Sequence, residues 1–399
     1  MSASDLIAQR IRERGPITVA EFMSIVLYHP EFGYYARAER RTGRNGDFIT
    51  SVDVGPLFGT LLARQFADMW RVMRDQAGPM EADTFDIVEA GAANGQLARD
   101  VLDAAHAEDF EFYRALRLHL VEASPAARAA QREMLARHAG KIASSATQLP
   151  DAVHGVVYSN ELIDALPVHA IVMTGDGLRE CYVDLKGDTF VERVGPPSTA
   201  ALARHLRSCG ATLEPGWRAE VNLAAVAWMT RACLSLHQGF ILLIDYGHEA
   251  AELYSVTHSA GTLTTFTKHV SEARRAEDRP PWLIDPGSRD IASHVNLTAM
   301  RDVAEGLGCR TLGMLDQTYF MLALATGSDP GGDPTQGSDP PDGSTQSWGS
   351  DPRGAVKRRL ALKTLILPGG LGSSQKVMIF GKNVGTPQLR GLAGPSRLT

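Results

Sequence analysis

The stretch from Phe85 to Leu97 constrains the fold of this chain more than any other. It has the pattern of a short buried strand, a turn of small residues from Gly91 to Gly95, and the apolar face of a helix that follows the turn. Small residues let a backbone approach a ligand closely, and Glu89 places a carboxylate at the carboxyl end of the strand, where open α/β sheets bind ligands. This order predicts a nucleotide-type site.

The spacing of the small residues distinguishes between classes of ligand. A dinucleotide fingerprint needs glycine-like residues at positions 91, 93 and 96, but position 96 is Gln, whose side chain would stand where the helix must pack against the strand. The prediction of a nicotinamide-dependent oxidoreductase is therefore weak. A tight strand-to-helix turn that binds nothing is the alternative interpretation at this point.

Strand and helix patterns alternate along the chain and predict an α/β fold with a doubly wound, seven-stranded sheet. The last strand is most simply antiparallel. The predicted strands are 85–88, 116–122, 142–145, 155–160, 239–247, 310–316 and 376–380. The predicted helices are 4–14, 18–27, 54–73, 126–138, 297–307 and 355–365.

The same patterns predict how the chain divides. The predicted parts are an N-terminal helical and aromatic-loop extension (1–80), a first core part (81–169), an inserted α+β subdomain (170–236), a second core part (237–326), a flexible Gly/Ser/Asp/Pro insertion (327–352), a C-terminal helix and edge strand (353–384) and a tail (385–399). The insertion has too few apolar residues to bury a core.

Polar residues follow two further strands of the predicted sheet. Glu122 ends the second strand, where a carboxylate can accept both hydrogens of a ribose hydroxyl pair. Asn160, Glu161 and Asp164 follow the fourth strand and predict a catalytic or substrate-binding role at the same edge. Helix capping by Asn160, with acids near a helix N-terminus, is the alternative.

Composition excludes several classes of protein. The formal charge of −6 and the absence of a long basic run give no prediction of nucleic-acid binding, and no apolar run reaches the roughly 20 residues of a membrane helix. Four scattered cysteines indicate reduced thiols in a cytosol-like compartment, and the Arg-rich composition is typical of a GC-rich bacterial genome. His269 and His294 lack metal-like spacing, so no metal site is predicted.

Taken together, the motifs resemble the family of mitochondrial complex I assembly methyltransferases and their bacterial relatives, from about Pro16 to Lys382. The order and spacing of the matching blocks make the resemblance specific. The blocks are Tyr28-His29-Pro30 through Gly33-Tyr34-Tyr35, Gly46 to Ser51, Glu89 to Gly95, Ser159-Asn160-Glu161 with Asp164 to Pro167, Asp245-Tyr246-Gly247, and the weaker Asp290 with His294-Val295.

The resemblance implies a class I methyltransferase fold, S-adenosylmethionine as cofactor and methylation of an arginine in a protein substrate, a core subunit of respiratory complex I. Two departures stand out. The family usually has Gly where this chain has Ala93, and the Gly-Ser-Asp-Pro insertion is not a family feature.

The resemblance also implies roles for individual residues. Glu161 and Asp164 would hold the guanidinium and Asn160 would shape the pocket, while the tyrosines and the Gly46 loop would close over the site. The predicted cofactor-binding residues are Glu89, Gly91, Ala93, Gly95, Glu122, Ala123, Gly46, Asp47, Phe48, Thr50, Ser51 and Tyr34. An assembly chaperone without catalysis and a small-molecule methyltransferase are the alternatives. The sequence does not predict an oligomeric state.

Overall fold

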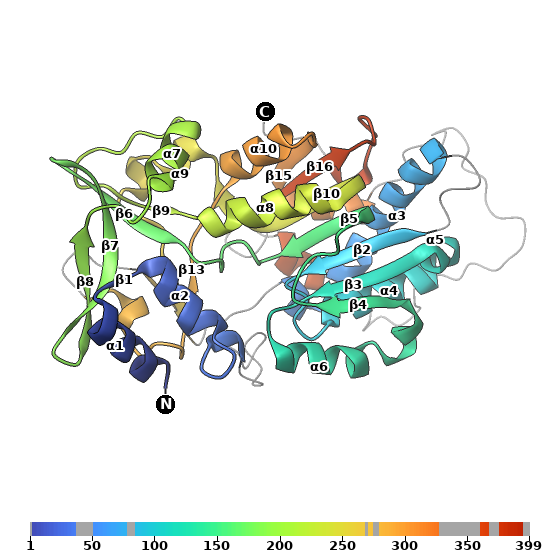
Figure 1. The fold of residues 1–399 in the computed structure, drawn as a ribbon. Coiled ribbons are helices and arrows are strands. Elements are labelled where there is room, and N and C mark those ends of the chain that lie inside the picture. The colour runs from blue at the N-terminus through green and yellow to red at the C-terminus, as the bar shows by residue number, and fades with distance from the viewer. Residues whose placement is uncertain are drawn as a thin grey trace, which may run out of the picture.

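The structure is a computed structural model that describes residues 2–36, 51–77, 84–267, 270–273, 279–326, 360–366 and 375–393. Figure 1 shows two unequal parts side by side. One part holds a large sheet with helices on both faces. The other combines the N-terminal helices with the strands of the insert.

The large sheet has the predicted seven strands in the order β15-β16-β10-β5-β2-β3-β4, and the two-residue β14 adds an eighth at the end of β10. Strands β4, β3, β2, β5 and β10 are parallel, and β16 runs antiparallel to both β10 and β15. The bounds are β2 Phe85–Ala90, β3 Leu116–Val121, β4 Ile142–Ala146, β5 Val153–Asn160, β10 Leu236–His248, β14 Val295–Asn296, β15 Arg310–Asp316 and β16 Gln375–Lys382.

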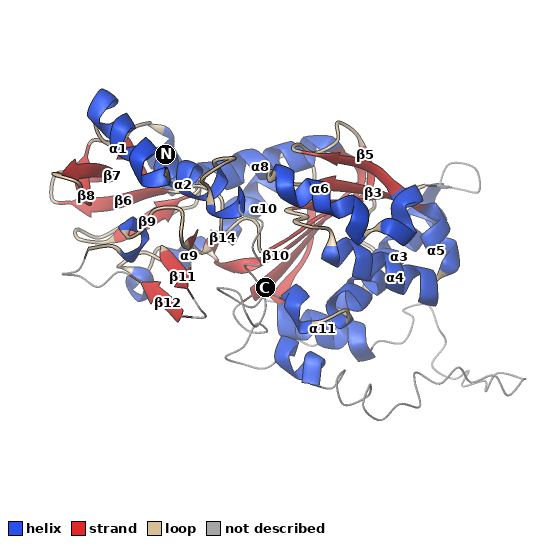
Figure 2. Ribbon diagram, turned by 90° about the horizontal axis from the view of Figure 1, so that it is seen from below, coloured by secondary structure: helices blue, strands red, loops and turns tan. Residues whose placement is uncertain are grey.

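Alternate residues of the central strands serve two separate cores. Ile87 of β2 and Leu242 of β10 face α3 and α4, whereas Val88 and Ile241 face α8 and α10. A strand buried on both faces must be apolar at nearly every position, which explains the continuous apolar runs in the sequence. Figure 2 shows the strands lying between these helix pairs.

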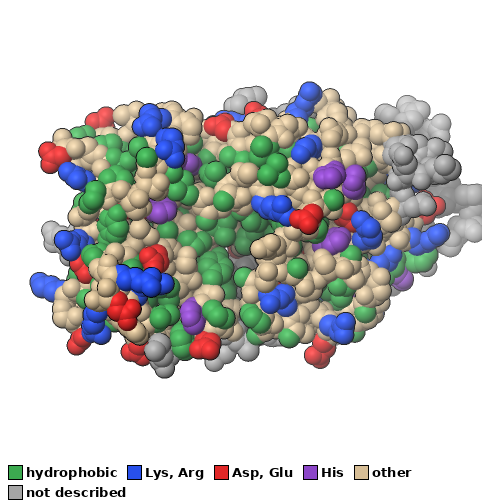
Figure 3. All heavy atoms as spheres, in the orientation of Figure 1, with side chains coloured by type: hydrophobic (Ala, Val, Ile, Leu, Met, Phe, Trp, Pro, Cys, Tyr) green, Lys and Arg blue, Asp and Glu red, His purple; other side chains and the backbone are tan. Residues whose placement is uncertain are grey.

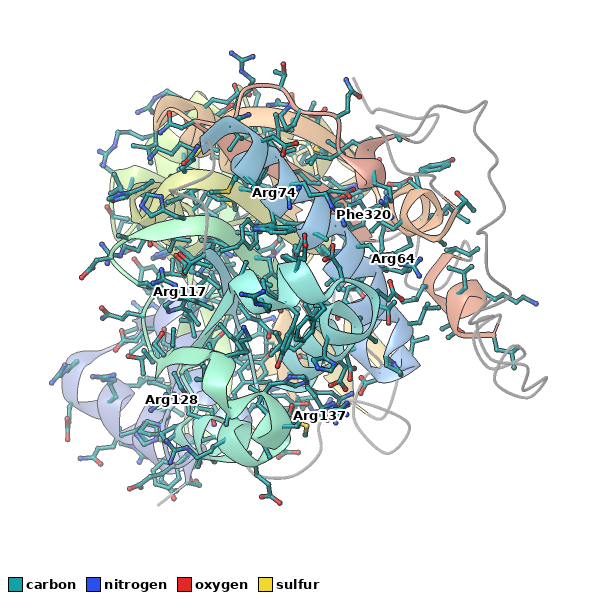
Figure 4. All side chains as sticks on the ribbon, turned by 90° about the vertical axis from the view of Figure 1, so that its right-hand side faces the viewer. Arg64, Arg74, Arg117, Arg128, Arg137 and Phe320 are labelled. Carbon is teal, nitrogen blue, oxygen red and sulfur yellow. The ribbon has the colours of Figure 1, made fainter. Side chains whose placement is uncertain are left out.

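Eleven α-helices have defined bounds among the described residues, and residues 360–366, within and just beyond the predicted helix 355–365, are helical as well. Figure 4 shows α3 beside α11. Phe320 of α11 belongs to the core that the large sheet forms with α3 and α4. The bounds are α1 Ala3–Arg14, α2 Val19–Tyr28, α3 Leu57–Ala77, α4 Gln96–Glu108, α5 Phe110–Ala115, α6 Pro125–Met134, α7 Ala201–Ser208, α8 Leu223–Ser235, α9 Ala250–Leu253, α10 Leu297–Gly306 and α11 Gln317–Thr326.

The insert forms a second sheet, in the order β1-β7-β6-β9 with β8 paired to β7. Its first strand comes from the N-terminus, because Ile17 pairs with Val183. Helices α1 and α2 cover this sheet and share a core with it. The bounds are β1 Ile17–Thr18, β6 His169–Thr174, β7 Gly177–Lys186, β8 Thr189–Gly195 and β9 Arg218–Val221.

Two details differ from the sequence-based expectations. The helix α8, which lies within the predicted insert 170–236, packs on the large sheet through Ala225, Met229 and Ala232, whose helical spacing forms one apolar face. The region after β10, where no strand was predicted before residue 310, contains a small antiparallel sheet in the order β12-β11-β13. Its strands are β11 Thr264–Thr267, β12 Val270–Ala273 and β13 Asp290–Ala292, each too short to leave a clear period-two pattern.

The distribution of charge on the surface agrees with the absence of a long basic run in the sequence. Basic and acidic side chains are interspersed on the face shown in Figure 3. Among the described residues, no helix is both long enough and apolar enough to cross a membrane.

Candidate active site

Four neighbouring parallel strands bring three predicted acids and Asp245 to one edge of the large sheet. Glu89 on β2 lies opposite Leu120 of β3 and Tyr158 of β5, and Asn160 of β5 lies opposite Ile244 of β10. The carboxyl ends of parallel strands share one edge, so Glu89, Glu122, Glu161 and Asp245 all reach it.

The turn after β2 has an unusual backbone. Gly91, Ala93 and Gly95 all have positive φ angles, of 74°, 43° and 84°. A Cβ on Gly91 would lie 3.2 Å from Leu162 Cδ1, a tight contact that a small shift of the leucine side chain could relieve, so glycine is favoured there mainly by its positive φ. Ala93 adopts a left-handed conformation that costs an L-residue about 1 kcal/mol.

Glu122 fixes this turn to the end of β3. Its Oε2 accepts a hydrogen bond from the backbone N–H of Ala93 at 2.8 Å, and its Oε1 accepts one from Ser124 N–H at 2.7 Å. Each carboxylate oxygen keeps acceptor capacity for a ligand hydroxyl. Ala123 is exposed beside it, and its carbonyl oxygen accepts from Arg128 Nη1 at 2.8 Å.

Glu89 is nearly fully buried, at 4% exposure. Its Oε2 atom has no hydrogen-bond partner among the described residues, and burial raises the pKa of the carboxyl to about 8. A buried acid with one unpartnered oxygen fits a cationic ligand, and S-adenosylmethionine carries both an ammonium and a sulfonium. The residues present therefore fit this cofactor.

Asp245 organises the loop that carries the predicted catalytic residues. Its Oδ2 accepts hydrogen bonds from the N–H groups of Leu162, Ile163 and Asp164 at 3.2, 2.7 and 3.4 Å. Its Oδ1 accepts from Tyr246 N–H at 2.8 Å. Burial nevertheless raises the pKa of this carboxyl to about 7.

Glu161 stands at the start of that loop with a positive φ of 51°. Its backbone N–H donates to Ile244 O at 2.9 Å, and its Oε1 accepts from Ser51 N–H and Asn160 Nδ2 at 3.3 and 3.2 Å. Burial raises the pKa of Glu161 to about 7. The pKa of Asp164 is raised well above its usual value, first by burial and then by the charge of Asp245.

Two of the predicted tyrosines contact this region directly. Tyr28 Oη donates to Ala165 O at 3.0 Å, and Tyr35 Oη donates to Asp290 Oδ1 at 2.8 Å. Tyr34, the tyrosine predicted to bind cofactor, is buried in the N-terminal core and packs edge-on against Tyr35.

Of the predicted loop, only Ser51 lies within the described residues; Gly46, Asp47, Phe48 and Thr50 lie outside them. Ser51 is fully buried. Its Oγ lies 3.3 Å from Gln317 Oε1 and 3.2 Å from Gln375 Oε1, which ties the loop to α11 and β16.

Sequence reasoning gave no role to Asp245, Gln317 or Gln375. Asp245 directly follows Ile244, the last residue of β10 that pairs with β5, so it lies at the same edge as Glu89 and could have been singled out by the same rule. The two glutamines carry no such signal, because they come from distant segments that meet Ser51 only in the folded chain.

Comparison with known proteins identifies the family. Residues 61–315 match the sequence model of a family described as S-adenosyl-L-methionine-dependent methyltransferases. This range holds Glu89, Glu122, Glu161 and Asp245 and every strand of the large sheet except β16 and the last residue of β15.

The alignments with two curated relatives cover most of this chain. The Drosophila melanogaster mitochondrial protein named protein arginine methyltransferase NDUFAF7 homolog is 29% identical, over 81% of this chain and 75% of its own. The human mitochondrial protein arginine methyltransferase NDUFAF7 is 27% identical, over 78% of this chain and 70% of its own.

A solved structure has the same fold over nearly the whole chain. The COG1565 superfamily member from Burkholderia thailandensis, bound to S-adenosyl-homocysteine, superposes with a TM-score of 0.81 at 27% identity. The alignment covers 98% of this chain and 94% of that one. The chain therefore belongs to the family of S-adenosylmethionine-dependent methyltransferases and uses S-adenosylmethionine as its cofactor.

Proposed function

We propose that this methyltransferase is a protein arginine N-methyltransferase. One observation carries the proposal: the carboxyls of the partly buried Glu161 and Asp164 and the buried Asp245 lie together, and all three have raised pKa values. No Lys, Arg or His within the described ranges forms an ion pair with any of them. A guanidinium from a substrate would supply the missing positive charge.

In this proposal the cofactor occupies the neighbouring half of the edge. Glu89 would face its cationic groups, Glu122 its ribose, and the turn Gly91-Ala93-Gly95 would lie beneath it. Ala123, Tyr34, Ser51 and the Gly46–Thr50 segment stay predicted cofactor contacts. When bound, S-adenosylmethionine supplies a methyl group on a positively charged sulfur.

The three carboxyls suit arginine in particular. A protonated guanidinium has five N–H donors and no free lone pair, so acids must orient it and accept a proton as a nitrogen becomes a nucleophile. Glu161 has a pKa of about 7, so its carboxylate can take up a proton near neutral pH. Asp245 holds the backbone of Asp164 in place and so positions the second acid.

The names of the curated relatives support arginine as the acceptor. The resemblance described above extends the proposal to a core subunit of a respiratory complex I type enzyme, in the cytoplasm of a bacterium. A cofactor-binding assembly chaperone and a small-molecule methyltransferase are the alternatives that the experiment must separate.

The test is product analysis. Purified protein is incubated with methyl-labelled S-adenosylmethionine and an extract from cells that lack this protein, and the labelled fraction is hydrolysed to amino acids. We expect labelled methylarginine. Labelled methyllysine or a labelled metabolite would refute the arginine assignment, and cofactor binding without any transfer would favour the chaperone.

Glu161→Gln tests the role of the acid. It should lower transfer by about 100-fold or more, because orientation and proton acceptance are both lost, while calorimetry shows normal cofactor binding. Glu21→Gln is the control, since Glu21 forms only a half-exposed ion pair with Arg10. Unchanged transfer by Glu161→Gln would show that this carboxylate does not act on the substrate.

A further inference from the structure

Three histidines from distant segments meet beyond the end of β10. His248 is the last residue of β10, His258 ends the 3-10 helix Val256–His258, and His294 precedes β14. One ring nitrogen from each lies within 4.8 Å of the others. The ring centroids are 4.7, 5.1 and 5.8 Å apart.

Glu252 contacts two of the three rings, each through its Nδ1 atom. His258 Nδ1 lies 3.1 Å from Glu252 O, and His248 Nδ1 lies 3.2 Å from Glu252 Oε1. Both contacts favour a proton on Nδ1, which leaves the lone pair on Nε2. Glu252 on α9 thus plays the part that carboxylates and carbonyls play behind metal-binding histidines.

The third ring has an unpaired buried nitrogen. His294 is partly buried, and its backbone N–H donates to Thr262 Oγ1 at 3.0 Å. Its Nδ1 atom is buried and has no hydrogen-bond partner among the described residues. A buried acceptor without a partner lowers the free energy of unfolding by about 1–3 kcal/mol. No hydrogen bond within the described residues compensates this cost at His294 Nδ1, which suits a ligand atom.

We propose that His248, His258 and His294 form a binding site for a divalent transition-metal ion of the Zn²⁺ type. In a tetrahedral site with metal–nitrogen bonds of about 2.1 Å, ligand nitrogens are roughly 3.4 Å apart and imidazole centres roughly 5 Å apart. The observed centroid distances bracket that value, so small ring rotations would complete the geometry. Three ligands leave a fourth position for water or a ligand.

A metal here would cross-link three parts of the fold. It would join the end of the central strand β10 to the segment after α9 and to the strand β14, which pairs with β10 through Gly247 and Val295. The sequence predicted no metal site because the ligand positions 248, 258 and 294 are far apart and follow no compact spacing. Their proximity is a property of the fold alone.

The test is metal binding by the full chain. Protein stripped with a chelator and dialysed is titrated with Co²⁺, which reports tetrahedral nitrogen coordination by visible absorption, and Zn²⁺ is then added as competitor. We expect one Co²⁺ per chain, displaced by Zn²⁺, and a rise in the melting temperature with either ion.

Variants decide which residues hold the ion. His258→Ala and His294→Gln should each weaken binding by more than about 100-fold, and Glu252→Gln by about 10- to 100-fold through the loss of ring orientation. His237→Ala is the control, because exposed His237 packs edge-on against His154 and these two belong to no cluster of three metal-binding side chains among the described residues. No stoichiometric binding, or equal binding by His294→Gln and the parent protein, would overturn the proposal. Equal loss in His237→Ala would overturn it as well.

Discussion

Replacing Glu89 with Gln should make the ligand-free protein more stable while weakening its hold on the cofactor. Burial raises the pKa of this carboxyl from the ordinary 4.5 to about 8, so near neutral pH the folded chain must bind a proton that the unfolded chain does not. An acid whose pKa is raised on folding favours the folded state below its unfolded pKa. That contribution is lost as pH rises toward the folded pKa. Gln removes the penalty, because a carboxamide is neutral at every pH and has the shape of the protonated acid.

The size of the effect follows from the two pKa values. The penalty grows by about 1.4 kcal/mol per pH unit between them, which gives about 1 kcal/mol at pH 5 and about 3 kcal/mol at pH 7. These are upper values, since water that enters the site would lower the shift. Glu89→Gln should therefore gain more stability at pH 7 than at pH 5, by up to about 2 kcal/mol.

The assay is urea unfolding of the parent and Glu89→Gln proteins at both pH values, with calorimetric titration of S-adenosylmethionine. Loss of one charge-assisted hydrogen bond should weaken cofactor binding by roughly 10- to 100-fold. Glu122→Gln is the control, because Glu122 already accepts two backbone hydrogen bonds and its replacement should not stabilise the protein. A Glu89→Gln protein that is less stable at pH 7, or equally stabilised at both pH values, would refute the reasoning.

Three further predictions concern the turn after β2, the loop that Asp245 holds, and the hydrogen bond between Tyr35 and Asp290. Ala93→Gly should stabilise the protein by about 0.5–1 kcal/mol in urea unfolding, because glycine adopts the positive φ without strain, whereas Ala98→Gly inside α4 should destabilise it by about 1 kcal/mol. Asp245→Ala should lower methyl transfer by about 100-fold, while Asp245→Asn, which keeps an acceptor for the loop amides, should retain far more activity; equal losses would contradict the positioning role. Tyr35→Phe removes the hydrogen bond to Asp290 and should cost about 1 kcal/mol of stability, with a larger effect on kcat than on cofactor binding.

The parts of the fold that local patterns determine were predictable. The apolar strands, their order of alternation with helices and the antiparallel last strand are confirmed. Glu89, Glu122 and Glu161 were expected at one edge because parallel strands align their carboxyl ends, and the structure brings them there. These inferences use only spacing along the chain and the geometry of a parallel sheet.

Other features depend on contacts that no local pattern encodes. The packing of α8 on the large sheet is decided by which apolar surface lies opposite its face, not by its position after the insert. The contacts of Ser51 with Gln317 and Gln375, and the cluster of His248, His258 and His294, join segments far apart in sequence. Long-range proximity of this kind has no signature in one sequence.

The pairing of β1 with β7 has a consequence for how the protein is made. Residues 17–18 leave the ribosome early, whereas their partners at 182–183 are synthesised much later. In the same way, Tyr28 and Tyr35 can form their hydrogen bonds only after Ala165 and Asp290 have been synthesised. Closing such long loops is slow, because the chain entropy is lost before the contacts form. The N-terminal segment should therefore dock late during synthesis, and the substrate half of the site would be assembled only after the cofactor half.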